Sequence, residues 1–214
     1  AHAPEPSNAP ERVSFFFAAH EDDWQLFMNP PAFRDVLDEK ARCVFLHVTA
    51  GDAGLGVGDG GRKHPYYLAR ENGAESAIRF MADANDRRPI VPTVAAISVA
   101  GHAIRRVGYR NTAAYFLRLP DGNPAGSGYA DTGYQSLQRL AKGEIDELSA
   151  VDSTTRYRGW DDLASTIRGI VDLEREPDLA VEFHVPETDP ATNPNEHSDH
   201  VFTAEAVLAA AKGL

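Results

Sequence analysis

The sequence predicts an α/β fold: a Rossmann-like, mostly parallel sheet flanked by helices, with a β-hairpin or antiparallel strand added to it. The first observation is the short apolar run at residues 13–19. Such a run is typical of a strand buried on both faces, and these strands belong to parallel sheets covered by helices. The second observation is the length of 214 residues, without an internal repeat or a dividing linker. A chain of this size suits one domain with a proper core.

The other elements follow from local patterns taken in chain order. Pro30 and Pro31 end a short helix that begins at Trp24, because proline cannot continue a helix. Apolar residues recur at helical spacing between Tyr66 and Met81. Helices are expected at residues 24–28, 32–40, 66–81, 136–143, 160–174 and 201–212. Strands are expected at residues 13–19, 43–48, 93–100, 112–119 and 178–185.

A basic segment at residues 105–110 lies between two of the predicted strands. We expect it to form the turn or link of a hairpin, exposed to solvent. Binding of nucleic acid is the alternative for a basic segment that contains a tyrosine. The net charge of -11 disfavours it, because nucleic-acid phosphates and anionic membranes would be repelled.

Composition limits the remaining classes. No apolar run approaches the length of a membrane span. Cys43 is the single cysteine, so no intrachain disulfide can form, and its apolar neighbours predict a small core residue. Residues 1–10 are rich in proline and are expected to form a flexible arm before a domain at 11–214. The start without methionine favours a removed signal peptide, and hence secretion, over a cytoplasmic location or an artificial start.

One histidine and three carboxylates follow the first predicted strand directly, at His20, Glu21, Asp22 and Asp23. In open α/β sheets, ligands bind outside the carboxyl ends of the strands. Burying an unpaired carboxylate at that edge would cost on the order of several kcal/mol. A bound cation would offset this cost and would explain why the carboxylates are there. An equally good explanation is that the carboxylates only charge the first turn of the next helix.

A second cluster, Asn195–His200, favours the cation. It brings two histidines and an aspartate within four residues and precedes a strong helix pattern. A catalytic zinc site has three protein ligands and an open position for water. His20, Asp23 and a histidine of the second cluster form one such ligand set, which leaves Asp22 free to act as a base.

These segments resemble the paired motifs of the PIG-L/LmbE-like N-acetylglucosaminyl deacetylases. Residues 19–23, Ala-His-Glu-Asp-Asp, resemble the usual first motif, Ala-His-Pro-Asp-Asp, and residues 197–200, His-Ser-Asp-His, match the last motif. Residues 46–54 resemble the second-strand segment, so the resemblance extends from about residue 13 to the C-terminus. The departures are Glu21, where proline is usual, and Gly73, where many members carry a glutamate three residues after the arginine that Arg70 matches.

The resemblance implies a zinc-dependent hydrolase that removes an N-acetyl or other N-acyl group from an amino-sugar substrate or glycoconjugate. Zn²⁺ is the expected metal, although such a ligand set also suits other divalent metals. The implied metal ligands are His20, Asp23 and His200. The implied catalytic residues are Asp22 as general base, His197 as the oxyanion donor and Asp199 as the carboxylate that orients an imidazole. The implied substrate-binding residues are Arg70, Asp121 and Asp52.

Several alternatives remain open at this point. Arg70 fits an ordinary ion pair equally well, and Asp121 fits a turn-forming aspartate before Gly122. The glycine-dense segment 49–61 is expected to be a mobile wall beside the metal; it lacks the ending of a phosphate-binding loop. The rival functions are a two-metal phosphoesterase and a non-catalytic carbohydrate-binding or interaction protein on the same scaffold.

Overall fold

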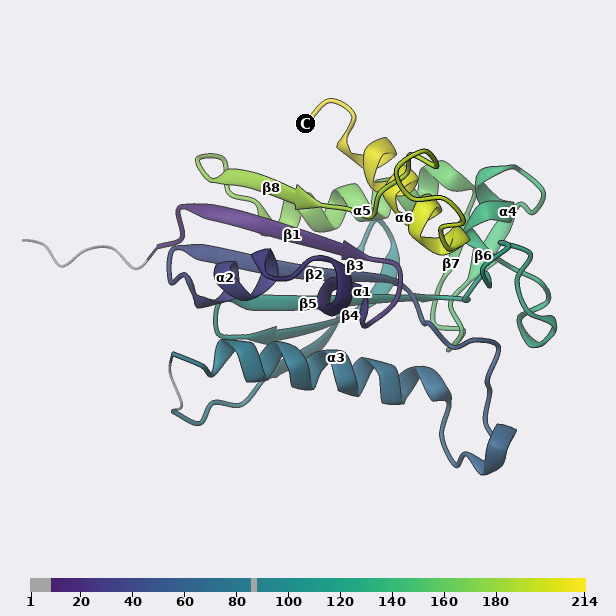
Figure 1. The fold of residues 1–214 in the computed structure, drawn as a ribbon, viewed down its shortest axis with the longest axis horizontal. Coiled ribbons are helices and arrows are strands. Elements are labelled where there is room, and N and C mark those ends of the chain that lie inside the picture. The colour runs from purple at the N-terminus through teal and green to yellow at the C-terminus, as the bar shows by residue number, and fades with distance from the viewer. Residues whose placement is uncertain (1–8, 86–87) are drawn as a thin grey trace, which may run out of the picture.

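A six-stranded, mostly parallel sheet forms the centre of the molecule (Figure 1). The computed structural model describes residues 9–85 and 88–214, so most of the predicted N-terminal arm lies outside the described residues. The strands lie in the order β3-β4-β5-β2-β1-β8. Strands β5, β2, β1 and β8 are mutually parallel, whereas β4 is antiparallel to both β3 and β5. The predicted single-domain α/β fold with an antiparallel addition is therefore confirmed.

The strands of the sheet have the following bounds: β1 Arg12–Ala18, β2 Ala41–Thr49, β3 Thr93–Val99, β4 His102–Tyr109, β5 Thr112–Leu119 and β8 Ala180–His184. The short strands β6 (Glu147–Ser149) and β7 (Arg156–Arg158) form a separate antiparallel pair, which the sequence did not predict. The helices are α1 Asp23–Phe27, α2 Pro31–Leu37, α3 Tyr66–Ala82, α4 Leu137–Ala141, α5 Trp160–Glu174 and α6 Ser198–Ala211, with the 3₁₀ turns η1 Asp59–Gly61 and η2 Ala130–Thr132.

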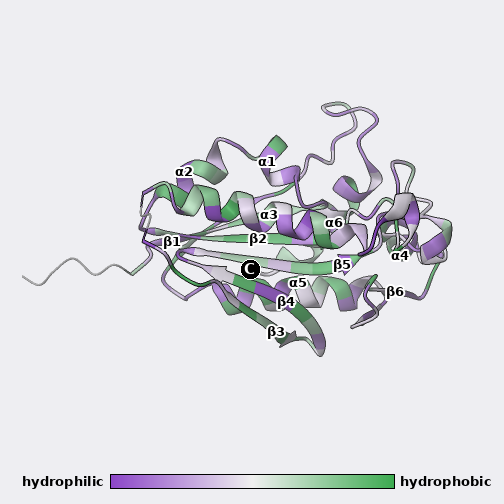
Figure 2. Ribbon diagram, turned by 90° about the horizontal axis from the view of Figure 1, so that it is seen from below, coloured by the Kyte–Doolittle hydropathy of each residue, from purple (hydrophilic) through white to green (hydrophobic). Residues whose placement is uncertain are grey.

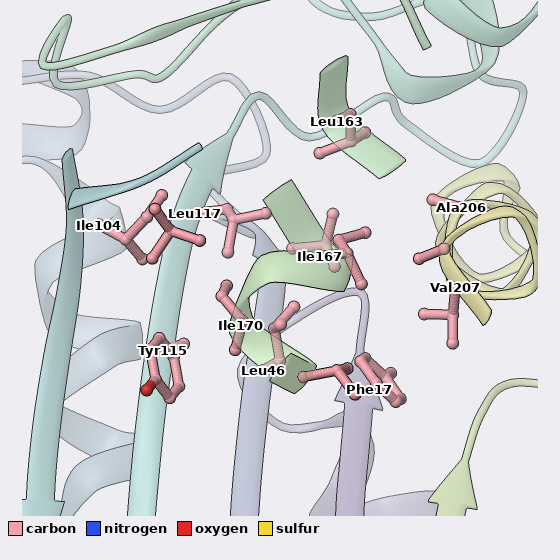
Figure 3. Close-up of a cluster of buried hydrophobic side chains, with 14 of the residues drawn as sticks. Phe17, Leu46, Ile104, Tyr115, Leu117, Leu163, Ile167, Ile170, Ala206 and Val207 are labelled. Atoms are coloured by element: carbon pink, nitrogen blue, oxygen red, sulfur yellow. The ribbon is translucent and has the colours of Figure 1, made fainter. Parts of the chain in front are cut away.

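The helices cover both faces of the sheet and create two cores. Figure 2 shows α2 and α3 on one side of the sheet and α5 on the other. In Figure 3, Ile167 and Ile170 of α5 and Val207 of α6 face the side chains of the strands. The opposite core contains Trp24 of α1 and Ile78 of α3. Among the helices in residues 9–85 and 88–214, none combines the length and the apolar composition that a membrane span requires.

Strand β1 contributes side chains to both cores, which explains its apolar sequence. Phe15 and Phe17 belong to the core under α5 and α6, and Phe16 belongs to the core under α1–α3. Successive side chains of a strand point to opposite faces, so a strand covered on both sides needs apolar residues throughout. Cys43 of β2 is a buried residue of the second core, as predicted.

The basic segment 105–110 differs from the prediction, because most of it is part of strand β4 and is not a solvated turn. Arg105 donates to Glu75 of α3 at 2.6 Å, and Arg106 donates to Glu174 of α5 at 2.9 Å. The two arginines lie on opposite faces of the sheet and meet carboxylates that are distant in the sequence. A charge pattern alone does not reveal such partners, since they come together only when the helices fold onto the sheet.

Glu174 links the end of α5 to three strands. Its carboxylate accepts hydrogen bonds from Arg42 of β2 at 2.6 Å, from Arg106 of β4 and from the Tyr115 hydroxyl of β5 at 2.5 Å. Glu174 is buried, and these partners outweigh the effect of burial and lower its pKa. The network therefore holds a charged carboxylate inside the fold.

We expect Glu174→Ala to lower the free energy of unfolding by about 3 kcal/mol, because it removes the acceptor for two partly buried arginines and for the buried hydroxyl of Tyr115. Urea denaturation monitored by circular dichroism measures the change. Asp172→Ala is the matched control on the same helix, because Asp172 forms only exposed ion pairs with Arg168 and Arg175; its effect should stay below about 1 kcal/mol. Equal effects of the two substitutions would contradict the role given to Glu174.

Candidate metal centre

The candidate site lies at the carboxyl edge of the parallel strands, where the fold class places ligands. His20 follows β1, Asp52 follows β2, and Asp121 follows β5. The first turn of α6 brings Asp199 and His200 to the same edge, 180 positions after His20, and the two histidine rings lie 3.2 Å apart at Nδ1 of His20 and Nε2 of His200. The two clusters found in the sequence are therefore one site in space.

Three side chains converge at the centre of this site. Nε2 of His200 lies 3.2 Å from Oδ1 of Asp23, and Nδ1 of His20 lies 3.5 Å from the same oxygen. With the separation of 3.2 Å between the two nitrogens, the donor atoms form a nearly equilateral triangle. Ligand atoms at about 2.0–2.1 Å from a tetrahedral Zn²⁺ lie about 3.3 Å from one another. The triangle thus fits three vertices of a zinc site and leaves the fourth vertex for water.

Carboxylates outside the triangle orient both imidazoles. Oδ2 of Asp199 lies 3.3 Å from Nε2 of His20, and Oε1 of Glu196 lies 2.6 Å from Nδ1 of His200. Each outer nitrogen then carries a proton and donates it to its carboxylate, so each inner nitrogen presents a lone pair towards Asp23. Two lone pairs and a carboxylate oxygen at this distance repel one another unless a cation or protons lie between them. The donor set therefore fits a divalent metal.

The pKa values of His20, His200 and Asp23 are shifted by their contacts with one another and with the neighbouring carboxylates. Burial alone lowers the pKa of His20, but hydrogen bonds with Asp199 and Asp23 outweigh it and raise the pKa to about 10. Burial also lowers the pKa of His200, but the hydrogen bond with Asp23 outweighs burial, and the pKa of His200 is raised. Burial raises the pKa of Asp23, and the two histidines outweigh it and lower that pKa. The carboxylates thus favour a positive charge on both imidazoles, and those charges favour the ionised form of Asp23.

Glu196 is the functional candidate to which the sequence analysis gave no role. It belongs to the second cluster and lies in the chain just before the N-cap of α6, four residues before His200. The signal in the sequence was a carboxylate at this spacing from a histidine, which brings the two side chains onto one face of the helix start. Asp199, which the resemblance implies as the carboxylate that orients an imidazole, lies closer to the ring of His20 than to that of His197.

A second group of polar side chains lies on the other side of His20. Its members are Asp121, His197 and Asp199, which offer ligand atoms together with Nε2 of His20. The distances are wider here: Nε2 of His20 lies 3.9 Å from Asp121, and Nε2 of His197 lies 4.0 Å from Asp121. The backbone N–H of Asp199 donates to Nδ1 of His197 at 3.1 Å, so the proton of a neutral His197 is on Nε2. The Nε2–H of His197 faces Asp121 and can act as a hydrogen-bond donor to a ligand.

Asp199 is completely buried and connects the two groups. Its Oδ2 accepts the backbone N–H of Gly122 at 2.9 Å as well as contacting His20. Its Oδ1 has no hydrogen-bond partner within the part of the chain that the structure describes. A side chain at position 122 would place Cβ 2.5 Å from Oδ1 of Asp199, so this approach requires glycine.

Arg70 holds the loop that carries the first cluster. Its Nε donates to Glu21 at 3.0 Å, and its Nη2 donates to Asp22 at 2.5 Å. Of the two interpretations of Arg70, substrate contact or ion pair, the structure contains the ion pair. Asp22, expected to be free, is half-exposed and paired with this guanidinium, whereas Glu21 is buried, and burial raises its pKa to about 8. Gly51 leaves the space for the pair, since a Cβ there would lie 2.7 Å from both Nε of Arg70 and Oε2 of Glu21.

Asp52 and Asp121 join the loops after β2 and β5. Oδ1 of Asp52 accepts the backbone N–H of Asp121 at 3.0 Å. Oδ1 of Asp121 accepts the N–H of Asn123 at 2.8 Å, which is the turn-forming arrangement that the sequence analysis considered. Both carboxylates are buried, and Oδ2 of Asp121 is the atom close to His20. Gly73, the second departure from the resemblance, lies on α3 with open space where a side chain would stand.

Two further histidines, His47 and His184, pack against aromatic rings of the fold. His47 is fully buried, stacks on Phe116, and burial lowers its pKa to about 4. His184 stacks on Phe16 and lies near Asp35 and Glu182, a third group that could hold an ion. Asp35, however, already accepts hydrogen bonds from Arg12 and Ser14. This group therefore fits a metal less well than the triangle does.

Comparison of the chain with models of known protein families, with curated proteins and with solved structures gave no match. The deacetylase resemblance therefore rests on the sequence motifs alone.

We expect the purified protein to bind about one Zn²⁺ per chain, because the three donor atoms form a single site with the separations that suit this ion. Elemental analysis after dialysis measures the content, and His200→Ala and His20→Ala should each abolish it. His64→Ala is the matched control, since His64 is exposed. A His200→Ala protein that retains the metal would contradict this ligand set, and two ions per chain would favour the two-metal phosphoesterase.

Proposed function

We propose that the chain is a metal-dependent hydrolase that removes an N-acetyl or other N-acyl group from an amino-sugar substrate. The observation that carries the proposal is the triangle of His20, Asp23 and His200, with carboxylates behind both imidazoles. The deacetylase resemblance of the two motifs supplies the reaction and the substrate class. Zn²⁺ is the proposed metal.

In this proposal, His20, Asp23 and His200 hold the ion. When bound, such an ion supplies an activated water nucleophile and a Lewis acid for the amide carbonyl. Asp199 and Glu196 keep each imidazole in the tautomer that presents a lone pair to the ion. Carboxylate partners of this kind also raise the basicity of the ligand nitrogens, which strengthens binding.

Asp22 is the proposed general base. It precedes the ligand Asp23 in the chain and, as a half-exposed side chain, is accessible to water and substrate. It would take the proton of the attacking water and deliver it to the leaving amine. Arg70 fixes the carboxylate of Asp22 by the ion pair at 2.5 Å, and Glu21 fixes Arg70 in turn.

His197 is the proposed donor to the developing oxyanion. Its Nδ1 accepts the backbone N–H of Asp199, which leaves the Nε2–H to face Asp121 beside His20. A neutral imidazole can serve in this role, because the donor is a fixed N–H in a partly buried place and no positive charge is required.

We expect His197→Ala to reduce the turnover of an N-acetylated amino sugar by about 10²–10³-fold while the metal stays bound, as for the loss of one oxyanion donor. Acetate release measures turnover, and elemental analysis measures the metal. His64→Ala should leave both values unchanged. Normal turnover of His197→Ala would remove His197 from the mechanism.

We expect Asp22→Asn to keep the metal and to lose at least about 10²-fold in turnover, because an amide cannot accept the proton. The same two assays apply, with Asp59→Asn as a control at an exposed carboxylate of η1. Loss of the metal from Asp22→Asn would mean that Asp22 is a ligand and that the division of roles between Asp22 and Asp23 is wrong.

A further inference from the structure

A large cavity lies beside the candidate metal centre, at the same edge of the sheet. Its volume is about 790 Å³, which is within the usual range of small-molecule sites. The glycine-rich loop after β2 forms one wall, and the segments at residues 131–135 and 149–153 form the others. The short elements that carry these segments gather at the right-hand end of the sheet in Figure 1.

Asp52 connects this cavity to the metal centre. It lines the cavity and accepts the backbone N–H of Asp121 at 3.0 Å. Asp121 in turn lies 3.9 Å from Nε2 of His20. Asp52 and Asp121 thus form a short chain of side chains between the wall of the cavity and the metal centre.

The charge of the cavity is one-sided. Among the described residues that line it are Asp52, Asp131 and Asp152, whereas none is lysine, arginine or histidine. The charge of Asp152 is balanced from outside the cavity by Arg118, at 2.5 Å. Asp52 and Asp131 have no ion pair with any residue that the structure describes. Carboxylates of one sign in a recess produce a negative potential, which attracts cations and repels anions.

The rest of the lining is rich in hydrogen-bonding groups. Thr132, Ser149, Ser153 and Gln135 contribute hydroxyl and amide groups. Such groups, together with carboxylates, can pair with the hydroxyl groups of a saccharide in either direction. Two residues of the glycine-rich loop, Leu55 and Val57, add apolar surface for the carbon face of a sugar ring.

We propose that this cavity binds the part of the substrate beyond the scissile amide, and that this part is hydroxyl-rich and carries an unacylated, protonated amino group. The inference rests on the proposed hydrolase function, because that function places the amide at the metal. Substrates with a phosphate or carboxylate in this part are excluded by repulsion from Asp52 and Asp131. The substrate is thus a cationic, partly N-acylated oligosaccharide or similar aminoglycoside.

Binding of disaccharides without an amide tests the cavity separately from catalysis. The zinc-loaded protein is titrated calorimetrically with a glucosamine disaccharide, with cellobiose and with cellobiouronic acid, at mildly acidic pH. We expect the glucosamine disaccharide to bind about tenfold more tightly than cellobiose, roughly the effect of 1.4 kcal/mol. The acid should bind more weakly than both, and added salt should reduce the differences. Equal affinities, tighter binding of the acid, or no binding of any disaccharide would overturn the proposal.

Variants distinguish the cavity from direct binding of the amine to the metal. Asp131→Asn should reduce the preference for the glucosamine disaccharide to about threefold or less, because it removes an unpaired carboxylate that is not a candidate metal ligand. Asp178→Asn is the control with the same change in charge, since Asp178 precedes β8 at the opposite edge of the sheet. A preference that survives both Asp131→Asn and Asp52→Asn would show that the amine binds elsewhere and would overturn the proposal.

Hydrolysis then separates this inference from the proposed function. Acetate release is compared for N-acetylglucosamine linked to glucosamine, to galactose and to glucuronic acid. Faster release from the first substrate, by about tenfold in kcat/KM, supports both proposals. Equal rates for the three substrates would overturn the substrate class and leave the hydrolase intact. Selective binding of the glucosamine disaccharide without release of acetate from any substrate would overturn the hydrolase and leave the cavity assignment standing.

Discussion

The contact between Asp199 and His20 is the interaction on which the site depends. It joins the end of the first strand to the start of the last helix, across 179 positions of the chain. The carboxylate is fully buried, so the imidazole must keep its Nε2 proton to satisfy it, and Nδ1 is left to face Asp23 and His200. Without this contact the ring could rotate, and the two polar groups on either side of His20 would lose their common member.

The parallel sheet explains why this contact forms at all. Strands β1, β2 and β5 run in one direction, so the loops that follow them meet at one edge. Helix α6 packs under β1 and points its N-terminus to that edge, where backbone N–H groups are available to carboxylates and to His197. Both cores thus serve the site: Phe15 and Phe17 fix β1 against α5 and α6, and Phe16 fixes it against α1.

Electrostatic balance divides the site into two parts. Around Asp22 and Glu21, the guanidinium of Arg70 compensates the carboxylates, and Gly51 is the residue that leaves room for it. Around His20 and in the neighbouring cavity, carboxylates exceed fixed positive charges, as the positions of Asp121, Asp52 and Asp131 illustrate. A cation at the triangle and a cationic substrate in the cavity would each supply what the second part lacks.

Local patterns in the sequence were sufficient to predict the fold class, the order of the main elements except β4, and the residue types of the two clusters. These properties follow from local patterns: the apolar run of β1, the prolines after α1, and histidines beside carboxylates. The partners of Arg70, Arg105 and Arg106, the contact of Glu196 with His200 and the cavity beside Asp52 became visible when the chain was seen folded. The physical reason is that ion pairs and cavities depend on which side chains meet across the sheet, and a charge has the same local pattern whether its partner is water or a buried carboxylate.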